Sequence, residues 1–492
     1  MISRPWVRIS IIGVAVGISV LGFILTSGLY FRIGFPLDDA WIHQTYARNL
    51  VQNGEWAYIP GQVSGGSTSP LWTLLIAIGQ FTGDIPLFWT FLIGAFSLFG
   101  ITILGDRIFH SIDGENGVAP PRYFPWVGLF LAFEWHLVWA AASGMETALF
   151  AVIILLFFYF LNKGSKSWWI TGMLTGMAIW IRPDGITLAG PLIIVLLFQR
   201  RPWHERFVEI SKSFLIFLLL FLPYLAFMYL VTGNMWPNTF YAKQMEYSIL
   251  LQLPIFVRII ALAELPLVGA GILLLPGFFW FCWISIRNRN GYQAAMVCWL
   301  IGYILMYVLW LPVIYQHGRY LMPAMPIYFV TGIMGTKWVI KRFLGGGGWQ
   351  RILKTSWVIL IGLVCLIFYG YGALAYADDV AIIETEMVNT AKWIGENIPK
   401  RDVIAAHDIG ALGYYGNHRL VDLAGLISPE IIPIIRDETS LAIYLDAKHV
   451  NYLVTFPGWY PILTQNRILL FTTHGEYSVQ AGGENMSIYE WK

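Results

Sequence analysis

Long apolar segments alternate with short polar connections through the first three quarters of the chain. A helix needs about 20 mostly apolar residues to cross a bilayer, with a usual range of roughly 17–25. The pattern therefore predicts an α-helical polytopic membrane protein whose transmembrane module occupies residues 1–376. We predict about eleven transmembrane helices, at 9–32, 86–105, 123–142, 147–161, 168–182, 186–199, 213–232, 264–286, 293–313, 320–337 and 356–376.

The segment 33–85, between the first two predicted spans, contains a polar island. It begins near Phe35 and includes two adjacent acidic residues, Asp38 and Asp39. The stretch from Pro70 to Thr82 is apolar but too short to cross a membrane. We expect 33–85 to form a first outer loop in which this stretch is an interfacial helix.

The pattern changes from about Ala377 onward. Ile383, Met387, Ile394 and Ile398 fit one face of a helix. Short β-like runs then alternate with helical or turn stretches, which predicts a small C-terminal α/β domain at 377–492 on the outer face. These runs are Asp402–Ala406, Arg419–Leu423, Asn451–Phe456, Ile468–Thr472 and Ser487–Trp491.

Composition agrees with a membrane protein. The 492 residues are 57% hydrophobic and only 12% charged, whereas soluble domains carry about 25% charged residues. The 23 tryptophans suit aromatic belts at membrane interfaces. The three cysteines, Cys282, Cys298 and Cys365, fall within apolar runs, so we expect neither a disulfide framework nor a metal cluster from them.

Basic residues predict the orientation, because Lys and Arg accumulate in cytoplasmic loops. This distribution places the N-terminus in the cytoplasm and, with an odd number of spans, the C-terminal domain outside the plasma (inner) membrane. The Gly345–Gly348 run is then a cytoplasmic linker. Alternate connections carry Arg4, Arg8, Arg107, Arg122, Lys163, Lys166, Arg200, Arg201, Arg206, Lys212, Arg287, Arg289 and the Lys337–Lys354 cluster, whereas the others hold only Arg48, Arg182, Lys243, Arg258 and Arg319.

The Asp38–Asp39 pair is the first candidate for chemistry. One Asp could cap the helix predicted to start near Ala40, where a carboxylate is favoured at the first turn. Capping needs only one acid, however, and two adjacent carboxylates raise each other's pKa. That cost is more typical of a general base or a metal ligand, so we expect a catalytic role.

Arg182, Lys243 and Arg319 lie on the predicted outer side, against the bias of the basic residues. Each could be an anchor that reaches interfacial lipid phosphate. At the same depth as the acid pair, the three together could instead hold an anionic headgroup beside a carboxylate. We favour this second interpretation.

Other polar residues near the outer ends of predicted spans have structural explanations as well. Glu134 and His136 could satisfy each other or fix helix packing, and Glu146 could do either this or serve a site. Turn or capping roles are expected for three residues of the C-terminal domain, His407, Asp408 and Asp422. The sequence contains no zinc-ligand spacing, Walker loop, dinucleotide fingerprint or Gly-x-Ser-x-Gly elbow.

Several blocks, in this order, resemble the GT-C superfamily of glycosyltransferases that use polyprenyl-phosphate sugars. The similarity is greatest to terminal arabinofuranosyltransferase-like enzymes, with protein O-mannosyltransferases and lipid A aminoarabinose transferases as more distant relatives. The blocks are Asp38–Asp39, Tyr46–Leu50, Gly65–Trp72, Ser143–Phe150, Arg182–Gly185, Pro237–Lys243, Arg319–Pro326, Asp408–Tyr415 and Val421–Leu426.

The resemblance implies a GT-C fold and transfer of a sugar to an acceptor hydroxyl outside the membrane. It implies that Asp38 is the general base, whereas Asp39 stands where the family often has Glu and could bind acceptor, bind a divalent cation (Mg, Mn or Ca) or assist the base. Glu146 is the other candidate cation ligand. The donor phosphate would contact Lys243, Arg182, Arg319, His317 and Tyr320, and the substrates would contact Glu146, Asn238, Tyr241 and Arg48.

This chemistry is consistent with the residues, since a carboxylate can take the proton of an attacking hydroxyl and cations can stabilise the departing phosphate. Direct displacement with one base predicts inversion at the anomeric carbon. The main alternative is a transporter or lipid flippase with an outer acidic ion site, although such sites usually lie near the bilayer midplane within inverted repeats. An oligosaccharide ligase is a second enzymatic alternative. The sugar, and whether the acceptor is a glycan, a lipid or a protein, stay open; no nucleic-acid partner is expected.

Overall fold

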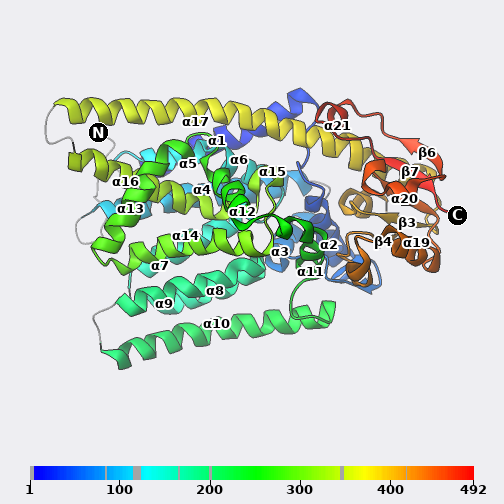
Figure 1. Cartoon of the computed structure of the whole chain (residues 1–492), viewed down its shortest axis with the longest axis horizontal. Helices are drawn as coiled ribbons and strands as arrows, with labels where there is room; N and C mark the ends of the chain where they lie inside the picture. The colour runs from blue at the N-terminus through cyan, green and yellow to red at the C-terminus, as the bar shows by residue number, and fades with distance from the viewer. Residues whose placement is uncertain are drawn as a thin grey trace.

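The computed structural model describes residues 5–81, 83, 86–114, 123–164, 167–198, 202–343, 348–416 and 418–492. Most helices run side by side along the long axis, and a mixed α/β unit covers one end of the bundle (Figure 1). The C-terminus lies in this unit, whereas the N-terminus lies at the opposite end of the bundle (Figure 1). Predicted features at Arg4, Arg122, Lys166, Arg200, Arg201 and 345–347 fall outside the described residues.

Five helices of the described chain are long and apolar enough to cross a membrane. Two bent pairs raise the number to as many as seven if each pair is one span: α6 (Trp135–Ala142) with α7 (Thr147–Asn162), bent by 120°, and α12 (Ile255–Glu264) with α13 (Gly271–Arg287), bent by 109°. The chain is thus a multi-pass α-helical membrane protein, as predicted. The five are α1 (Pro5–Tyr30), α4 (Pro86–Asp113), α10 (Trp203–Thr232), α14 (Gly291–Trp310) and the helix that begins with α17 (Gly348–Ile383).

Other predicted spans are shorter or broken. The predicted span 123–142 divides at Glu134, whose extended backbone separates α5 (Trp126–Phe133) from α6. The Glu134 side chain accepts a hydrogen bond from the Leu137 amide and caps α6. The remaining helices of the bundle are α8 (Trp168–Ile181), η3 (Pro183–Leu188), α9 (Ala189–Phe198) and α16 (Met325–Phe343), which follows the turn η6 (Met322–Ala324).

The first outer segment, so named for its predicted side, folds into α2 (Asp39–Asn53), a two-stranded antiparallel hairpin and α3 (Pro70–Gln80). The hairpin strands are β1 (Ala57–Ile59) and β2 (Gln62–Val63). The helix predicted from Pro70 is confirmed as α3, whose buried residues Trp72 and Ile76 pack with Ala47 of α2. The polar island is therefore an ordered platform built on two helices.

The C-terminal unit contains a five-stranded sheet with the order β4-β3-β5-β7-β6. All five β-like runs predicted from the sequence are confirmed, and the helical face of Ile383 and Ile394 is buried as expected. β3 is parallel to β4 and β5, whereas β7 is antiparallel to β5 and β6. The strands are β3 (Val403–Ala406), β4 (Arg419–Asp422), β5 (Tyr452–Thr455), β6 (Ile468–Thr472) and β7 (Ser487–Glu490).

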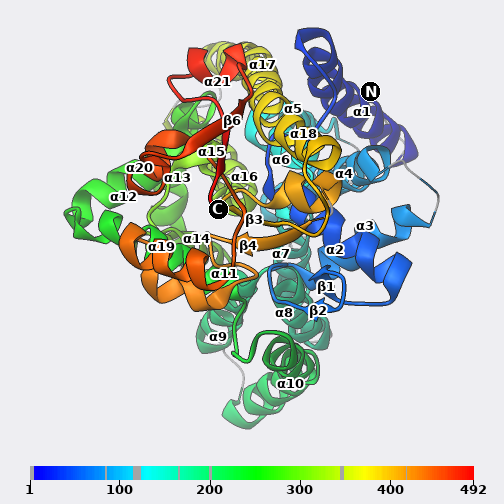
Figure 2. The ribbon, with the colours of Figure 1, turned by 90° about the vertical axis from the view of Figure 1, so that its right-hand side faces the viewer.

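A continuous helix joins the bundle to this sheet. α17 passes through a π-helical turn, Glu384–Val388, directly into α18 (Asn389–Asn397). The three segments form one uninterrupted helix, Gly348–Asn397. Seen from the sheet end, α2 and the β1–β2 hairpin lie beside β3 and β4 (Figure 2). The first outer segment and the C-terminal unit thus meet at the same end of the bundle.

Candidate active site

Asp38 links the start of α2 to the C-terminal unit. It precedes α2 but makes no capping bond to that helix. Its Oδ2 instead accepts a 2.6 Å hydrogen bond from the Gly410 amide, and its Oδ1 accepts a 2.8 Å bond from the Ala411 amide. These amides begin a helical segment at 410–416, where a negative charge is favoured. The capping partner is therefore 372 residues away in the chain rather than local.

Asp39 points in another direction, toward the bundle. Its Oδ2 accepts a 2.5 Å hydrogen bond from Nη2 of Arg319, a residue that is itself buried. Arg319 follows a turn in which Gln316 and His317 have φ of 53° and 57°, backbone angles that L-residues rarely adopt. The His317 ring lies 2.8 Å from Oδ2 of Asp379, which anchors this turn to α17.

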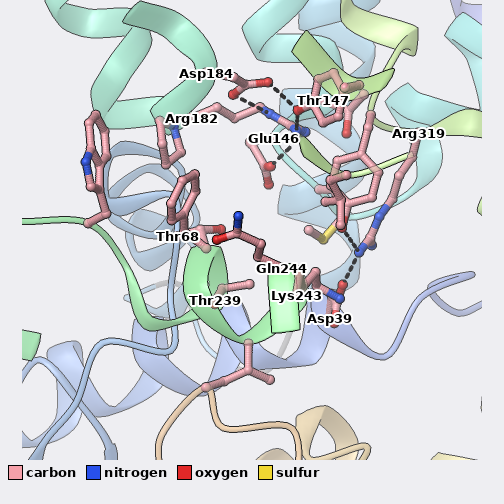
Figure 3. A pocket seen from close by; sticks show the side chains of 18 of the residues that line it. Asp39, Thr68, Glu146, Thr147, Arg182, Asp184, Thr239, Lys243, Gln244 and Arg319 are labelled. Carbon is pink, nitrogen blue, oxygen red and sulfur yellow. Dashed lines mark hydrogen bonds and ion pairs between the residues drawn. The ribbon is translucent and has the colours of Figure 1, made fainter. Parts of the chain in front are cut away.

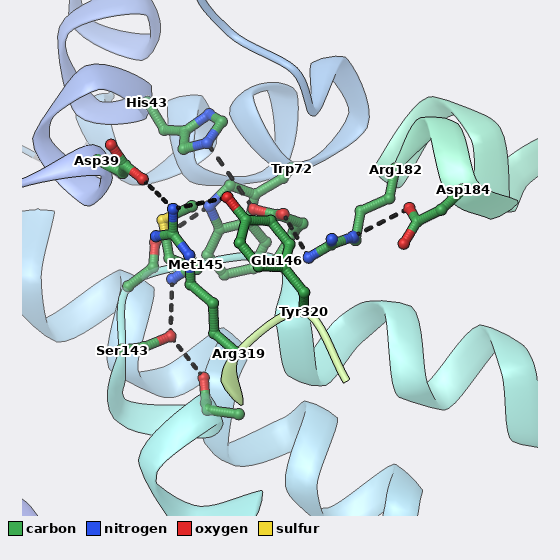
Figure 4. A network of polar contacts seen from close by, with 12 residues as sticks. Asp39, His43, Trp72, Ser143, Met145, Glu146, Arg182, Asp184, Arg319 and Tyr320 are labelled. Atoms are coloured by element: carbon green, nitrogen blue, oxygen red, sulfur yellow. Dashed lines mark hydrogen bonds and ion pairs between the residues drawn. The ribbon is translucent and has the colours of Figure 1, made fainter. Parts of the chain in front are cut away.

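Arg182 is the centre of a second polar network, to the right of the first in Figure 4. Its guanidinium lies 3.1 Å from Oδ1 of Asp184 and 3.5 Å from Oε1 of Glu146. The Tyr303 and Tyr307 hydroxyls donate to Oδ2 of Asp184 over 2.6 Å and 2.7 Å. Asp184 is thus fully bonded and holds Arg182 in place.

His43 contacts the second network through Glu146 and was not among the predicted site residues. It lies one turn after Asp39 on α2, and its Nε2 is 3.8 Å from Oε2 of Glu146. Its Nδ1 is 3.1 Å from the Thr73 hydroxyl and 3.2 Å from the Ser67 hydroxyl. The sequence carries one signal for it, the i, i+4 spacing from Asp39 that places both side chains on one helix face.

An apolar cavity of about 370 Å³ opens beside these networks (Figure 3). Asp39, Glu146, Arg182, Lys243 and Arg319 line its polar side. The rest of its wall is largely apolar and includes Ile42, Ile186, Trp236, Phe240, Met306, Trp310 and Leu311. The cavity therefore suits a molecule with an anionic head and an apolar tail.

A second, more polar cavity of about 600 Å³ lies between the bundle and the C-terminal unit. Asp38, Asp39, Lys243 and Arg319 line it on the bundle side. His407, Asp408, Trp459 and Tyr460 line it on the other side. Asp39, Ile42, Lys243, Arg319 and Leu426 line both cavities, so one acid and two cations lie where the cavities meet, and Asp38 lies on the polar side.

The electrostatics separate the two acids. Burial, together with the nearby charge of Asp408, raises the pKa of Asp38 to about 8, although the amides of Ala411 and Gly410 oppose this shift. Burial would also raise the pKa of Asp39, but the charges of Arg319 and Lys243 hold it well below its usual range. Adjacent carboxylates with opposite pKa shifts are typical of residues with different roles.

Lys243, at the end of the short helix α11 (Asn238–Glu246), differs from the two arginines. Arg319 and Arg182 are both ion-paired, whereas among the described residues no carboxylate lies within ion-pair distance of the Lys243 ammonium group. Burial lowers the pKa of Lys243, but Tyr315, Tyr320 and Asp39 around it raise that pKa well above its usual value, so Lys243 stays protonated. Its positive charge is available to a ligand in either cavity.

Four of the predicted site residues line neither cavity. Arg48 donates hydrogen bonds to the carbonyl oxygens of Gly413 and Tyr414, which ties α2 to the C-terminal unit. Asn238 donates to the Leu426 carbonyl oxygen over 3.1 Å, and His317 is held by Asp379. Tyr241 lies on α11 between lining residues without lining a cavity itself. These positions favour structural roles near the site over direct contact with substrate.

Asp408 is the residue that sequence reasoning placed least well. We expected a turn or capping role, yet its side chain lines the polar cavity, and its buried Oδ2 has no hydrogen-bond partner in the described chain. Asp422 does have the expected turn role, since its carboxylate accepts the amides of Ala424 and Ile427.

The carboxylates considered as cation ligands, Asp39 and Glu146, each face an arginine. Within the described ranges, no group of three or more His, Cys, Asp or Glu side chains has an arrangement that could hold a metal ion. The three cysteines are free, in accordance with the sequence.

Solved structures share this architecture. ArnT from Cupriavidus metallidurans superimposes with a TM-score of 0.61 at 13% identity, over 97% of both chains; a second structure of it, at 14% identity with the same TM-score and coverage, is bound to undecaprenyl phosphate. The oligosaccharyltransferase from Archaeoglobus fulgidus gives a TM-score of 0.62 at 10% identity over 92% of this chain and 70% of that one. This chain has the GT-C fold.

Sequence comparisons add less. A family described as "Domain of unknown function (DUF8728)" matches residues 375–489, the part of the chain that contains the five-stranded sheet. No curated protein sequence matches the chain. At 10–14% identity the solved structures establish the fold alone, and they leave the chemistry of the candidate site to its own residues.

Proposed function

We propose that this protein is a glycosyltransferase that moves a sugar from a polyprenyl-phosphate carrier to an acceptor hydroxyl on the extracytoplasmic side of the membrane. The observation that carries the proposal is the junction of the two cavities. There an apolar pocket with a cationic edge meets a polar pocket, Asp39 lines both pockets, and its neighbour Asp38 lines the polar one. A lipid-linked donor needs an apolar pocket with a cationic edge, and a hydroxyl acceptor needs a polar pocket beside it.

The donor phosphate would lie at the cationic edge of the apolar cavity. Lys243 has no carboxylate within ion-pair distance among the described residues, and Arg319 and Arg182 provide guanidinium groups that are already oriented by carboxylates. Charges that are in place before the reaction stabilise a developing phosphate without reorganisation. The polyprenyl chain would leave along the apolar wall, where Trp310 and Ile186 are 46% and 37% exposed. A structure of ArnT holds undecaprenyl phosphate, and one of the archaeal enzyme AglB holds a dolichol-phosphate.

Asp38 is the proposed general base. Its carboxylate lines the polar cavity, from which the acceptor would enter, and its pKa of about 8 lies close to working pH. A base is most effective when its pKa is near the operating pH. Asp39 has a depressed pKa, which makes it a weaker base, and its bond to Arg319 suits it to orient that cation.

The reaction is then a direct displacement. The acceptor oxygen attacks the anomeric carbon, its proton passes to Asp38, and the bond from the anomeric carbon to the phosphate oxygen breaks. The polyprenyl phosphate leaves as an anion and needs no general acid. One displacement inverts the anomeric configuration. We assign no step to a divalent cation, because both carboxylates considered as its ligands face arginines.

The experiment that tests the function is a mass-spectrometric search for free polyprenyl phosphate. The purified protein is incubated with polyprenyl-phosphate donors that carry arabinofuranose, mannose, galactose or glucose, together with a membrane glycan extract. Release of polyprenyl phosphate with gain of one sugar on an acceptor supports the proposal. Movement of intact donor lipid across a vesicle membrane without cleavage would favour a flippase instead.

A further inference from the structure

The polar cavity has features that identify what kind of acceptor it takes. We propose that it is the acceptor site and that its ligand is a neutral oligosaccharide, bound mainly by residues of the C-terminal unit. This inference rests on the proposed transferase function, because it names the second substrate of that reaction. Its evidence comes from residues that the donor side does not use.

The first argument is the position of the cavity on the sheet. β4, β3 and β5 are parallel, and residues of the segments that follow β3 and β5 line the cavity. Asp408 comes two residues after β3, and Trp459 ends the short helix Pro457–Trp459 that follows β5. In open α/β sheets, ligands bind outside the carboxyl ends of the parallel strands. The cavity occupies that position.

The second argument is the presence of hydrogen-bond acceptors that lack donors. Oδ2 of Asp408 and Oε1 of Gln316 are buried, and neither has a hydrogen-bond partner among the described residues. Both residues line the polar cavity, from opposite sides. A buried acceptor without a donor costs roughly 1–3 kcal/mol, so a ligand that brings hydroxyl donors would relieve this cost at two separate points.

The third argument is the aromatic side chain beside these acceptors. Trp459 lines the cavity and remains 51% exposed, with the His407 ring edge-on to it at 5.1 Å between ring centroids. The Tyr460 hydroxyl is fixed 2.8 Å from Nδ1 of His407. An aromatic face next to oriented polar groups suits the C–H face and the hydroxyl groups of a sugar ring.

The fourth argument is charge, which decides between neutral and anionic acceptors. Five acidic residues line the cavity against three basic ones. Two of the three cations, Lys243 and Arg319, lie at the end shared with the apolar cavity, where the donor phosphate is placed. Away from that end the wall carries Asp38, Glu246, Asp408 and Glu438 against Arg436 and His407, and this excess of acidic groups disfavours a uronic acid or a phosphorylated headgroup. The acidic residues are Asp38, Asp39, Glu246, Asp408 and Glu438.

The test is direct binding to the full-length protein in lipid nanodiscs, measured by saturation-transfer NMR without donor. The probes are neutral tetrasaccharides of glucose, mannose, galactose and arabinofuranose, compared with tetragalacturonate and with a blocked tetrapeptide that contains Ser and Thr. We expect at least one neutral tetrasaccharide to bind. Trp459→Ala should weaken this binding tenfold or more, whereas Trp459→Phe, which keeps an aromatic face, should stay within about threefold of the native protein.

Ile462→Ala is the matched control, since Ile462 is 60% exposed in the neighbouring helix and does not line the cavity. Preference for tetragalacturonate or for the peptide, absence of binding by every neutral tetrasaccharide, or unchanged binding by Trp459→Ala would overturn the inference. The transferase proposal is judged separately, by release of polyprenyl phosphate. Trp459-dependent sugar binding without any donor cleavage would uphold this site and reject the transferase.

Discussion

At the scale of single residues, Asp38 and Asp39 are neighbours in the chain with opposite surroundings. The Asp38 carboxylate accepts hydrogen bonds from two backbone amides, and burial together with the charge of Asp408 keeps its pKa high. The Asp39 carboxylate instead accepts a hydrogen bond from Arg319. The sequence shows the pair and predicts that it is functional. It cannot show the difference between its members, because Gly410, Asp408 and Arg319 are distant in the chain and reach the pair only through the fold.

The pH dependence of transfer follows from this difference. Asp38 must be ionised to accept a proton, so kcat/KM should rise about tenfold per pH unit below pH 8 and level off above it. Asp408→Asn removes a negative charge that raises the pKa of Asp38, and the rising limb should therefore move to lower pH. A profile that is flat between pH 5.5 and 9, or a limb unmoved by Asp408→Asn, would contradict the assignment.

Lys243 should contribute to donor affinity more than any other outer cation. Hydrogen bonds to charged groups are worth about 1.5–3 kcal/mol, so Lys243→Ala should weaken binding of the donor lipid by roughly ten- to a hundredfold. Arg258→Ala is the control, because Arg258 is another outer cation, donates to the carbonyl oxygens of Leu253 and Val308 and lines neither cavity. Equal donor affinity in the two variants, measured with a fluorescent polyprenyl phosphate, would remove Lys243 from the phosphate site.

At the scale of elements, the contact between α2 and the helical segment 410–416 brings the acid pair to the polar cavity. A Cβ on Gly410 would lie 1.9 Å from the carbonyl oxygen of Asp38, so the two elements approach as closely as a glycine allows. Arg48 adds two hydrogen bonds across the same contact. The block Asp408–Tyr415 was visible in the sequence, but its role as the partner of α2 was not.

Gly410→Ala tests this contact. The clash with the Asp38 backbone forces the elements apart, which should cost about 1–3 kcal/mol, lower the melting temperature and reduce transfer at least tenfold. Gly362→Ala is a suitable control, since a Cβ at this position of α17 meets no atom within 4 Å. Differential scanning fluorimetry and the transfer assay give both readouts. Native stability and activity in Gly410→Ala would show that the close approach is unimportant.

Element prediction succeeded where the pattern is local. The five strands and α3 follow from short apolar runs between turn residues, and the structure has all of them. The predicted spans were less accurate, because polar or Pro-containing sites such as Glu134 break helices that hydropathy joins. Trp459 and Asp408 could not be recognised as cavity residues, since only the parallel pairing of β3 with β5 brings their strand ends together.

At the scale of the whole molecule, the site and the C-terminal unit lie at one end of the bundle, and the basic ends of the helices lie at the other. The last turn of α16 carries Lys341 and Arg342, and it lies at the end far from the sheet (Figure 1). The orientation proposed here, with the C-terminal unit outside, follows from this arrangement and the positive-inside tendency.

Cysteine labelling tests the orientation. In a variant without Cys282, Cys298 and Cys365, Ile443→Cys should react with a membrane-impermeant maleimide in intact spheroplasts, because Ile443 is 67% exposed in the C-terminal unit. Trp349→Cys, at a 73% exposed position at the opposite end, should react only after permeabilisation. The reverse pattern would place the site in the cytoplasm and exclude an extracytoplasmic transferase.

The central claim, that Asp38 takes the proton of the acceptor hydroxyl, is tested most directly by single-turnover transfer in Asp38→Asn, with Asp39→Asn measured beside it. Asn keeps the size of the side chain but cannot accept a proton. Asp38→Asn should bind donor lipid with nearly native affinity and lose transfer by about 10²–10⁴-fold, whereas Asp39→Asn, which releases Arg319, should weaken donor binding as well. Near-native turnover by a folded Asp38→Asn protein would contradict the account.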